Sequence, residues 1–591
     1  MSKTKEWTLM FYMASDNPLA ISIVSQLKAL KAAGFHHQAN VIAQFDPFTE
    51  GTPTHIFDVN MINKLKYDEP NIGFDDNDTF VRNLIEDKLW RDEKSHDGKR
   101  KIREMLDEVM GTNHGIKYTA PVAPDLNGIT NANNGGASKF SSEMLSALKH
   151  HNGNGNAKAK RRRRREPGPF VSLYKFLDFC QKNYPARHYM LFMLGHGVVV
   201  GNDIFLFDEH AETQSITLSE MGIVLRDFKK KLDAQKATFD MVAFHSCSVS
   251  SVEVAAELRG TANYMLASQA PSFVGSWPYR NLLIRVFKDI QRNGKKTDVK
   301  SVLSDIFSYC FHNSTDYLLA GYSYQLTLCN LRKIGDITKP IDTLSNALIK
   351  GLEDPGSRFI ILYAHWKAQS FFQEMYTDLY DFCYCIADRY NRIVEAGVKP
   401  RPQLEAINDA CRDVLKVLTK PAHNGDGELS ENALIPRAEF IGPAYQYSHG
   451  MSIYFPWSRP SEDSQIMQEY ERYKFNQRVR CSWADFLKEY FDETQRETHN
   501  QEQDWQYQLT GKRTGKLSIE YKLQEDIASL VYNGEGPLGG FALTKESVTD
   551  RTGEDSGCLS FKNYPRDTRS RGERRKSAQA MPVSGTLLGE F

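Results

Sequence analysis

Long apolar runs, paired cysteines and an excess of charge of either sign are all missing from this chain of 591 residues. No run approaches the ~18 apolar residues that a membrane-spanning helix needs, so we do not expect a membrane protein. The nine cysteines are few, odd in number and without CxxC spacing, which argues against a disulfide framework or a zinc ribbon and for a reducing compartment. Lys and Arg balance Asp and Glu at 74 each, so the overall charge predicts neither a nucleic-acid nor a membrane partner.

The composition that remains is that of a folded, globular protein. Hydrophobic residues make up 41%, aromatic residues 11% and charged residues 25% of the chain, which excludes wholesale disorder. The first stretch, MSKTKEWTLMFYMASDNPLA, lacks a long apolar segment after its lysines and a small-residue cleavage site. We therefore expect a cytoplasmic protein.

Short apolar runs alternate with helix-period segments along the first half of the chain. The runs that predict strands buried on both faces are Trp7–Met13, Asn40–Phe45, His188–Leu194, Phe239–Phe244 and Asn263–Ser268. Apolar residues recur three and four apart, as in helices, in Asn17–Ala33, Phe170–Asn183, Leu218–Leu232, Val249–Gly260 and Tyr279–Arg292. This alternation predicts an α/β fold with a largely parallel central sheet flanked by helices.

Composition also suggests how the chain is divided. We assign residues 1–330 to an α/β core, residues 331–496 to an added helical region packed on the core, and residues 497–591 to a polar region with a disordered end. The added region is predicted to be helical over Ile334–Leu418 and to contain a late strand at Met451–Phe455. Within the core, Gly111–Pro169 is rich in Gly, Asn, Ala and Pro and is predicted to be a mobile, exposed insert.

Two polar segments follow two of the predicted buried strands. Gly195-His196-Gly197 follows one strand and His245-Ser246-Cys247-Ser248 follows the other. Ligands of open parallel sheets bind at the carboxyl ends of the strands, so we expect His196 and Cys247 to face each other there. A thiol needs a base to become a nucleophile near neutral pH, and histidine titrates in that range. The pair therefore predicts a cysteine nucleophile with a histidine general base.

Neighbouring residues support this chemistry. A helix starting near Val249 would lower the pKa of the thiol through its unpaired N–H groups and its dipole. Ser250 and Glu253 have the spacing of a capping box, which favours a helix start there. The backbone N–H groups of Gly197 and Cys247 are candidates for an oxyanion hole.

Each of the two residues alone has an ordinary structural explanation. A single Cys after a strand is usually a small buried hydrophobic residue, and a His in a glycine-rich turn is usually a turn residue. Their joint occurrence at two matching strand ends favours catalysis over these explanations. Their spacing resembles the ~50 residues between the catalytic His and Cys of caspases, although the caspase pentapeptide is absent.

Six segments stand in order between about residues 6 and 495: WTLMFYMASDNPLA, HYMLFMLGHG, FDEHAETQSITLSEM, FDMVAFHSCSVSSVEVAAELRGTANYMLASQ, SWPY and HGMSIYFP. They resemble the successive landmarks of the clostripain-like cysteine peptidases. The resemblance implies a caspase-like peptidase core and a cysteine endopeptidase that acts on proteins or peptides without a cofactor. It also implies a catalytic dyad, with Cys247 as nucleophile and His196 as general base.

The sequence departs from this family at the substrate pocket, to which we assign His245, Gln269 and Gly275. The family commonly has Asp two residues before the nucleophile, where this chain has His245, and an acidic residue near the position of Gly275. A buried Arg or Lys needs a paired charge, so we expect weak preference for basic residues before the scissile bond. Small, apolar or acidic residues are expected instead, with a protonated His245 contacting an acidic one. The alternative is that Glu253 or Asp208 supplies the missing carboxylate.

A basic run near the end of the insert is a candidate cleavage region. It consists of Lys160, Arg161, Arg162, Arg163, Arg164 and Arg165. Family members can be activated by a cut at a basic residue between the His and the Cys, but this chain has no Lys or Arg from Gly197 until Arg226. We therefore expect control by a separate activating protease, by a regulatory partner, or none. The run lacks interleaved aromatic residues, so a nucleic-acid partner is not favoured, and no membrane partner is expected.

No metal site is expected either. Asp203, Asp208 and Glu209 lack the spacing of an EF-hand, and Cys383 and Cys385 lie in a helix-period segment typical of core packing.

Two alternatives to an active peptidase stay open. One is an inactive peptidase-fold scaffold or binding protein, suggested by the missing acidic positions, and the other is a nucleic-acid-associated protein that uses the arginine run.

Overall fold

The computed structural model describes residues 4–46 apart from Pro18, residues 54–60, and residues 168–493 with short gaps. The predicted insert up to residue 167, with its basic run at Lys160–Arg165, lies outside the described residues. The region 497–591 lies outside them as well. Predictions about these segments stay predictions.

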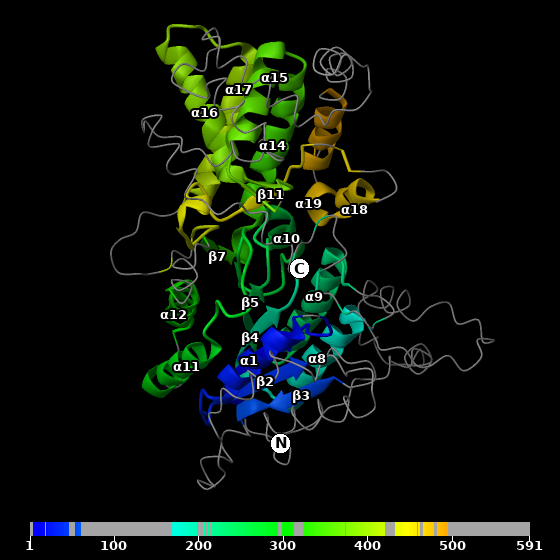
Figure 1. The fold of residues 1–591 in the computed structure, drawn as a ribbon, viewed down its shortest axis with the longest axis vertical. Coiled ribbons are helices and arrows are strands. Elements are labelled where there is room, and N and C mark those ends of the chain that lie inside the picture. The colour runs from blue at the N-terminus through cyan, green and yellow to red at the C-terminus, as the bar shows by residue number, and fades with distance from the viewer. Residues whose placement is uncertain are drawn as a thin grey trace, which may run out of the picture.

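The largest element of the described structure is an eight-stranded sheet with the order β10-β7-β6-β5-β4-β1-β2-β3 (Figure 1). Its strands are β1 (Lys5–Met13), β2 (Ala39–Phe45), β3 (His55–Asp58), β4 (Ala186–Leu194), β5 (Thr238–His245), β6 (Tyr264–Ala267), β7 (Tyr324–Asn330) and β10 (Arg437–Ile441). The five predicted strands are all present and run parallel to one another, from β2 through β1, β4 and β5 to β6. Antiparallel neighbours extend this parallel block at both edges. The predicted α/β class is therefore confirmed.

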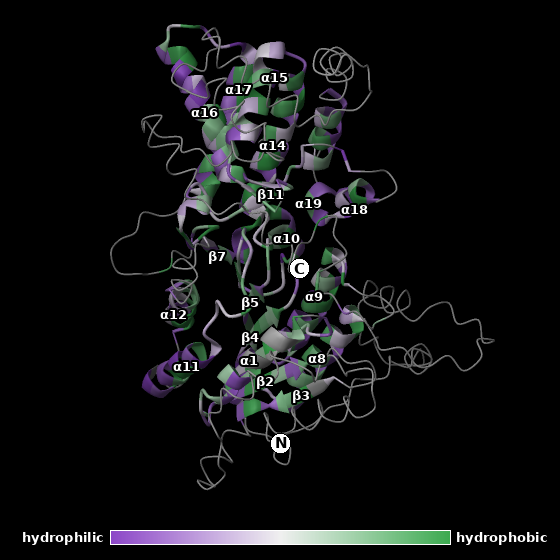
Figure 2. Ribbon diagram, viewed as in Figure 1, coloured by the Kyte–Doolittle hydropathy of each residue, from purple (hydrophilic) through white to green (hydrophobic). Residues whose placement is uncertain are grey.

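Helices cover both faces of this sheet. One face packs against α1 (Ala20–Lys31), α11 (Tyr279–Asn293) and α12 (Val299–His312), and the other against α8 (Pro169–Asn183), α9 (Leu218–Ala234) and α10 (Val252–Glu257). Side chains alternate along each strand, so Leu9 and Phe11 belong to one apolar cluster and Met10 and Tyr12 to the other. Figure 2 shows the consequence for the outermost helices, since α11 is mostly hydrophilic on its visible side.

The added region is less uniform than the sequence pattern predicted. The expected helical stretch Ile334–Leu418 contains α14 (Gly335–Leu352), α15 (Pro355–Lys367), α16 (Leu379–Glu395) and α17 (Pro402–Leu418), with two short strands between α15 and α16. Each later helix has its own start signal, which divides the stretch. Asp354 and Asp378 accept hydrogen bonds as N-caps of α15 and α16, and Pro402 opens α17.

A second, three-stranded antiparallel sheet has the order β11-β9-β8. Its strands are β8 (Ser370–Phe371), β9 (Tyr376–Asp378) and β11 (Ser452–Tyr454), the last of which matches the predicted late strand. An isolated bridge between Ser251 and Ser452 joins this small sheet to the segment that follows β5. The small sheet therefore lies directly against the carboxyl edge of the large one.

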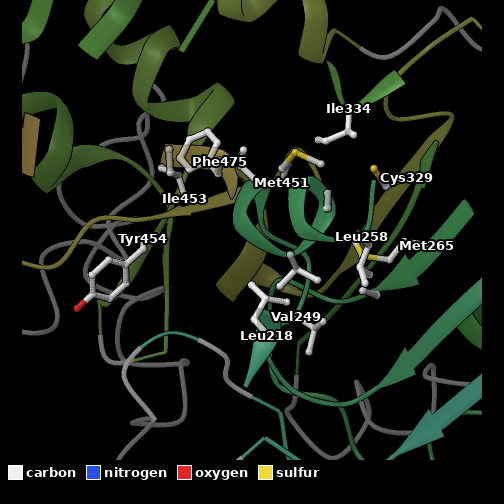
Figure 3. Close-up of a cluster of buried hydrophobic side chains, with 14 of the residues drawn as sticks. Leu218, Val249, Leu258, Met265, Cys329, Ile334, Met451, Ile453, Tyr454 and Phe475 are labelled. Carbon is white, nitrogen blue, oxygen red and sulfur yellow. The ribbon is translucent and has the colours of Figure 1, made fainter. Parts of the chain in front are cut away.

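The core and the added region share a hydrophobic cluster. Figure 3 shows Val249, Leu258 and Met265 of the core beside Ile334 and Met451 of the added region. Strand β10 also comes from the added region and completes one edge of the large sheet. The remaining elements are η3 (Leu331–Lys333), η4 (Pro443–Tyr445), α18 (Ile466–Arg472), α19 (Lys474–Gln477) and a helix over residues 483–493. No helix in the described part of the chain has both the length and the apolarity needed to cross a membrane.

Candidate active site

The ends of β4 and β5 carry the two residues predicted to be catalytic. These neighbouring strands are parallel, and Leu194 pairs with His245 at their last registered position. His196 and Cys247 each lie two residues beyond that pair, at the same edge of the sheet. Both are half-buried. The topology therefore places a thiol and an imidazole on adjacent strand ends.

Gly197 brings the loop after β4 into direct contact with Cys247. A Cβ atom on Gly197 would lie 2.5 Å from Cys247 N and closer still to Cys247 O, so only glycine fits. The loop is also fixed by Leu206 N, which donates a hydrogen bond to His196 O at 3.1 Å. Within the described part of the chain, neither Gly197 N nor Cys247 N has a hydrogen-bond acceptor. Both amides can therefore donate a hydrogen bond to an oxyanion.

The Cys247 thiol contacts the loop that follows β6. Ser272 N donates to Cys247 Sγ at 3.4 Å, and Sγ lies 3.8 Å from Ser272 O. Burial raises the pKa of Cys247, and the hydrogen bond with the Ser272 backbone opposes that rise only in part. The thiol is therefore protonated at neutral pH and needs a base before it can attack.

His196 has the charge state that such a base requires. Burial lowers its pKa from the ordinary value of 6.5, so the ring is neutral at pH 7. The resting pair is then a neutral imidazole beside a protonated thiol rather than an ion pair. A neutral ring of this kind can accept the thiol proton during attack.

The expected effect of a helix on the thiol is wrong. Helix α10 begins at Val252 instead of near Val249, and its N-cap is Ser251, whose Oγ accepts from Val254 N at 3.4 Å. Four residues therefore separate Cys247 from the helix, and the influence of a helix end falls off within about one turn. The pKa of the thiol is raised rather than lowered.

The proposed capping box is also wrong, because its two side chains point to the added region. Ser250 Oγ donates to Gly450 O at 2.8 Å. Glu253 Oε1 accepts from Tyr454 N at 2.8 Å and from Tyr470 Oη at 2.7 Å, and the Glu253 side chain is fully buried. Glu253 thus joins the core to the added region and is not positioned to replace a missing pocket carboxylate.

His245 lies beneath the site and is only 1% exposed. Its Nε2–H donates to Phe273 O at 2.7 Å, its Nδ1 accepts from Tyr279 Oη at 3.0 Å, and its ring stacks on Trp277 at 4.5 Å. Burial lowers the pKa of His245 to about 3, so the ring is neutral. The expectation that a protonated His245 contacts an acidic substrate residue is therefore wrong.

The other two expected pocket residues have different environments. Gln269 is fully buried, donates from Nε2 to Asp378 at 3.0 Å and accepts at Oε1 from Gly450 N at 2.8 Å. It is a junction between the core and the added region rather than a pocket wall. Gly275 is exposed in the turn before Trp277. Neither position supplies a negative charge.

Sequence reasoning missed two contacts of the site. Ser272 N holds the thiol from the segment PSFVGSW, in which only Gly275 was expected to belong to the site. Tyr376 of β9 accepts a hydrogen bond at Oη from Val200 N, at 2.9 Å, in the loop that carries His196. Val200 and Tyr376 are 176 residues apart in the sequence, so no local pattern predicts their contact.

The chain is similar to one family of proteins and to several solved structures. The model of the clostripain family matches residues 12–490. No curated protein sequence matches the chain. Among solved structures, an inactive zymogen C11 protease from Parabacteroides distasonis is 14% identical, with a TM-score of 0.41 over 80% of this chain and 98% of that one. A secreted C11 cysteine protease from Bacteroides thetaiotaomicron, bound to an irreversible peptide inhibitor, is 12% identical, with a TM-score of 0.39 over 81% of this chain and 99% of that one.

Proposed function

This chain belongs to the clostripain family of cysteine peptidases, and we propose that it cleaves protein substrates internally through a dyad of Cys247 and His196. The observation that carries the proposal is the contact between Gly197 and the Cys247 backbone, which leaves no room for a Cβ atom. That contact presses the loop with the base against the turn with the nucleophile.

The mechanism follows from the charge states of the two groups. His196 accepts the thiol proton as Cys247 Sγ attacks the scissile carbonyl carbon, and the N–H groups of Gly197 and Cys247 stabilise the oxyanion. His196 then returns the proton to the leaving amine, and water releases the acyl group. Every step uses groups of this chain and water.

A cysteine-directed covalent probe tests this function. We expect the wild-type protein to hydrolyse a denatured protein substrate and to be labelled first at Cys247. Cys180, Cys310 and Cys411 are fully buried and should react more slowly. Substantial hydrolysis by the Cys247→Ala variant would contradict the mechanism. Labelling without any hydrolysis would favour the inactive scaffold.

We also propose that the pocket before the scissile bond is uncharged. His245 is neutral and Gly275 has no side chain, so neither pairs with a basic substrate residue. Small or apolar residues should therefore be preferred. A peptide library profiled with wild-type protein measures this preference directly, and strong selectivity for Arg or Lys would contradict it.

Location and control form the last part of the proposal. We place the protein in the cytoplasm, with support from the seven free cysteines among the described residues. Cell fractionation with an antibody tests the location.

Control by an activating protease or a partner is tested by replacing Arg161–Arg165 with Ser and Gly and measuring activity before and after limited proteolysis. Unchanged activity in both conditions would exclude a regulatory role for the basic run.

A further inference from the structure

Among the described residues, the hydroxyl group of Tyr376 attaches the loop that carries His196 to the second sheet. Val200, four residues after His196, donates its backbone N–H to Tyr376 Oη at 2.9 Å. Both Val200 and Tyr376 are only 1% exposed. A buried N–H without an acceptor is costly, so the hydroxyl fixes where this part of the loop can lie.

Tyr376 is itself held rigidly. It belongs to the middle strand of the small sheet, where it pairs with Phe371 on one side and with Tyr454 on the other. Its ring also makes an edge contact with the Tyr454 ring at 5.9 Å. Asp378, at the end of the same strand, accepts a hydrogen bond from Gln269 at 3.0 Å, which ties the strand to the core. The hydroxyl is therefore a fixed point on a fixed strand.

We propose that Tyr376 is a positioning residue that sets the place of His196 relative to Cys247. This inference rests on the proposed function, because it assumes that His196 serves Cys247 as a base. The loop is held at Gly197 by contact with the Cys247 backbone and at His196 O by Leu206 N, and Tyr376 supplies the attachment that comes from the added region. The added region thus takes part in the reaction through a group that touches neither the substrate nor the reacting atoms.

The chain offers a matched pair of variants for a test. Tyr376→Phe removes the hydroxyl that accepts from Val200 N. Tyr454→Phe removes a buried hydroxyl that has no hydrogen-bond partner among the described residues, and it does so at the directly paired position of the neighbouring strand. Figure 3 shows the Tyr454 hydroxyl pointing away from the apolar cluster. The two substitutions are chemically identical and differ in the contact that is lost.

The readout is the rate at which iodoacetamide alkylates Cys247 between about pH 5 and pH 9. Mass spectrometry identifies the alkylated cysteine, and the rate is expressed per folded molecule. Alkylation needs no knowledge of the natural substrate. Wild type and His196→Ala are compared first, since a rate that does not depend on His196 would reject the dyad and this inference with it. Turnover of a protein substrate is then measured as kcat and KM separately.

We expect Tyr376→Phe to slow alkylation and to lower kcat by about tenfold, with little change in KM, because the base is misplaced while the substrate surface is kept. Its pH profile should approach that of His196→Ala. Tyr454→Phe should match wild type. Equal rates for the two Tyr→Phe variants, alongside a wild-type rate that does depend on His196, would overturn the positioning role and leave the dyad intact. If Tyr376→Phe is partly unfolded, the buried Cys180, Cys310 and Cys411 are alkylated as well, so their labelling measures the unfolded fraction and the rate at Cys247 is corrected for it.

Discussion

The two halves of the active site are attached to the rest of the molecule in different ways. The turn with Cys247 is held by backbone hydrogen bonds from Ser248 N to Ala270 O and from Val249 N and Ser250 N to Ser268 O. The described part of the loop with His196 is held by Leu206 N, by the tight fit of Gly197 and by the Tyr376 hydroxyl. The nucleophile turn is thus held mainly by backbone bonds to the segment after β6, whereas the base loop depends in part on a side-chain hydroxyl of β9.

This difference indicates that the large sheet places the nucleophile, whereas the small sheet helps to place the base. The nucleophile must lie at one defined place. Backbone hydrogen bonds between the segments that follow the adjacent strands β5 and β6 hold it there. The base must approach the nucleophile and later transfer its proton to a different atom. A loop that is held in part by a side-chain hydroxyl from the second sheet can be adjusted by changes in that sheet. Substitutions on the two sides should therefore have different effects.

The largest effect is expected when either reactive group is removed. Cys247→Ala and His196→Ala should each lower kcat/KM by at least about 10³-fold, and the double variant should lose no more than the stronger single one, because the two groups act as a unit. Both variants should unfold at about the wild-type temperature, since both side chains are only half-buried. Steady-state kinetics and thermal unfolding measure the two quantities. Fully additive losses in the double variant would show that the residues act independently.

The next largest effect should come from the contact between the two halves. Gly197→Ala places a Cβ atom 2.5 Å from Cys247 N, so the backbone of the base loop or of the nucleophile turn must move. A shift of about 1 Å at a reacting group can cost about 100-fold in rate, and we expect a loss of kcat of that order. Active-site titration followed by kinetics measures it.

Gly356→Ala is the matched control for this substitution. A Cβ atom on Gly356 in α15 would meet Asp354 at 3.5 Å, which is an ordinary van der Waals distance. This variant should keep wild-type activity and be as stable as wild type or slightly more so, because alanine favours a helix over glycine. A Gly197→Ala variant that is as active as Gly356→Ala would show that the halves do not need this close approach.

Sequence reasoning could place the strand ends that carry the two reactive residues, but it could not predict contacts between segments that are distant in the sequence. The strands with His196 and Cys247 have continuous apolar runs, and their parallel order follows from alternation with helices, so both residues could be placed at one edge of the sheet. The start of α10 was misplaced because Ser250 and Ser251 are adjacent candidates for its N-cap. In the structure Ser251 is the N-cap, and Ser250 Oγ donates to Gly450 O of the added region instead.

Contacts across the chain could not be predicted in this way. The hydrogen bond between Val200 and Tyr376, and the junction of Gln269 with Asp378 and Gly450, join residues that no periodic pattern relates. His245 was assigned to the pocket because the family that the sequence resembles has an acidic pocket residue two positions before the nucleophile. Its ring points beneath the site because Trp277 and Tyr279, far along the sequence, provide its stacking and hydrogen-bond partners.

A smaller effect, on stability, is expected at His245 beneath the nucleophile. The pKa of His245 is lowered to about 3 in the folded state, against 6.5 for an ordinary histidine, so the unfolded chain binds a proton more readily below pH 6.5. The stability that the neutral ring contributes is complete above pH 6.5 and is lost progressively as the pH falls toward 3. From pH 6.5 to pH 5 the loss should be about 2 kcal/mol of unfolding free energy.

His245→Gln tests this linkage. The variant should be about 1–3 kcal/mol less stable than wild type at pH 7.5, because its hydrogen bonds and stacking are disturbed. That difference should shrink as the pH falls to 5, since glutamine does not titrate. Urea unfolding at several pH values measures it, with His37→Gln on the exposed surface as the control for the same chemical change. A constant difference across the pH range would show that His245 is not held neutral.

The smallest effect should come from Ser248→Gly, at the residue after the nucleophile. Ser248 has a φ of 53°, in the left-handed region that suits glycine, and its buried Oγ has no hydrogen-bond partner among the described residues. Ser248→Gly relieves both costs but makes the unfolded chain more flexible, so stability should change by less than about 1 kcal/mol, toward a more stable protein. Ser248→Val, in contrast, forces a β-branched side chain into the same conformation and should cost about 1–3 kcal/mol. Urea midpoints of the two variants measure this contrast. The kcat of Ser248→Gly should also stay near the wild-type value, because the backbone bonds to Ala270 and Ser268, rather than the serine side chain, hold the nucleophile turn. A Ser248→Gly variant that unfolds more easily than Ser248→Val would show that the turn does not adopt the left-handed conformation in solution.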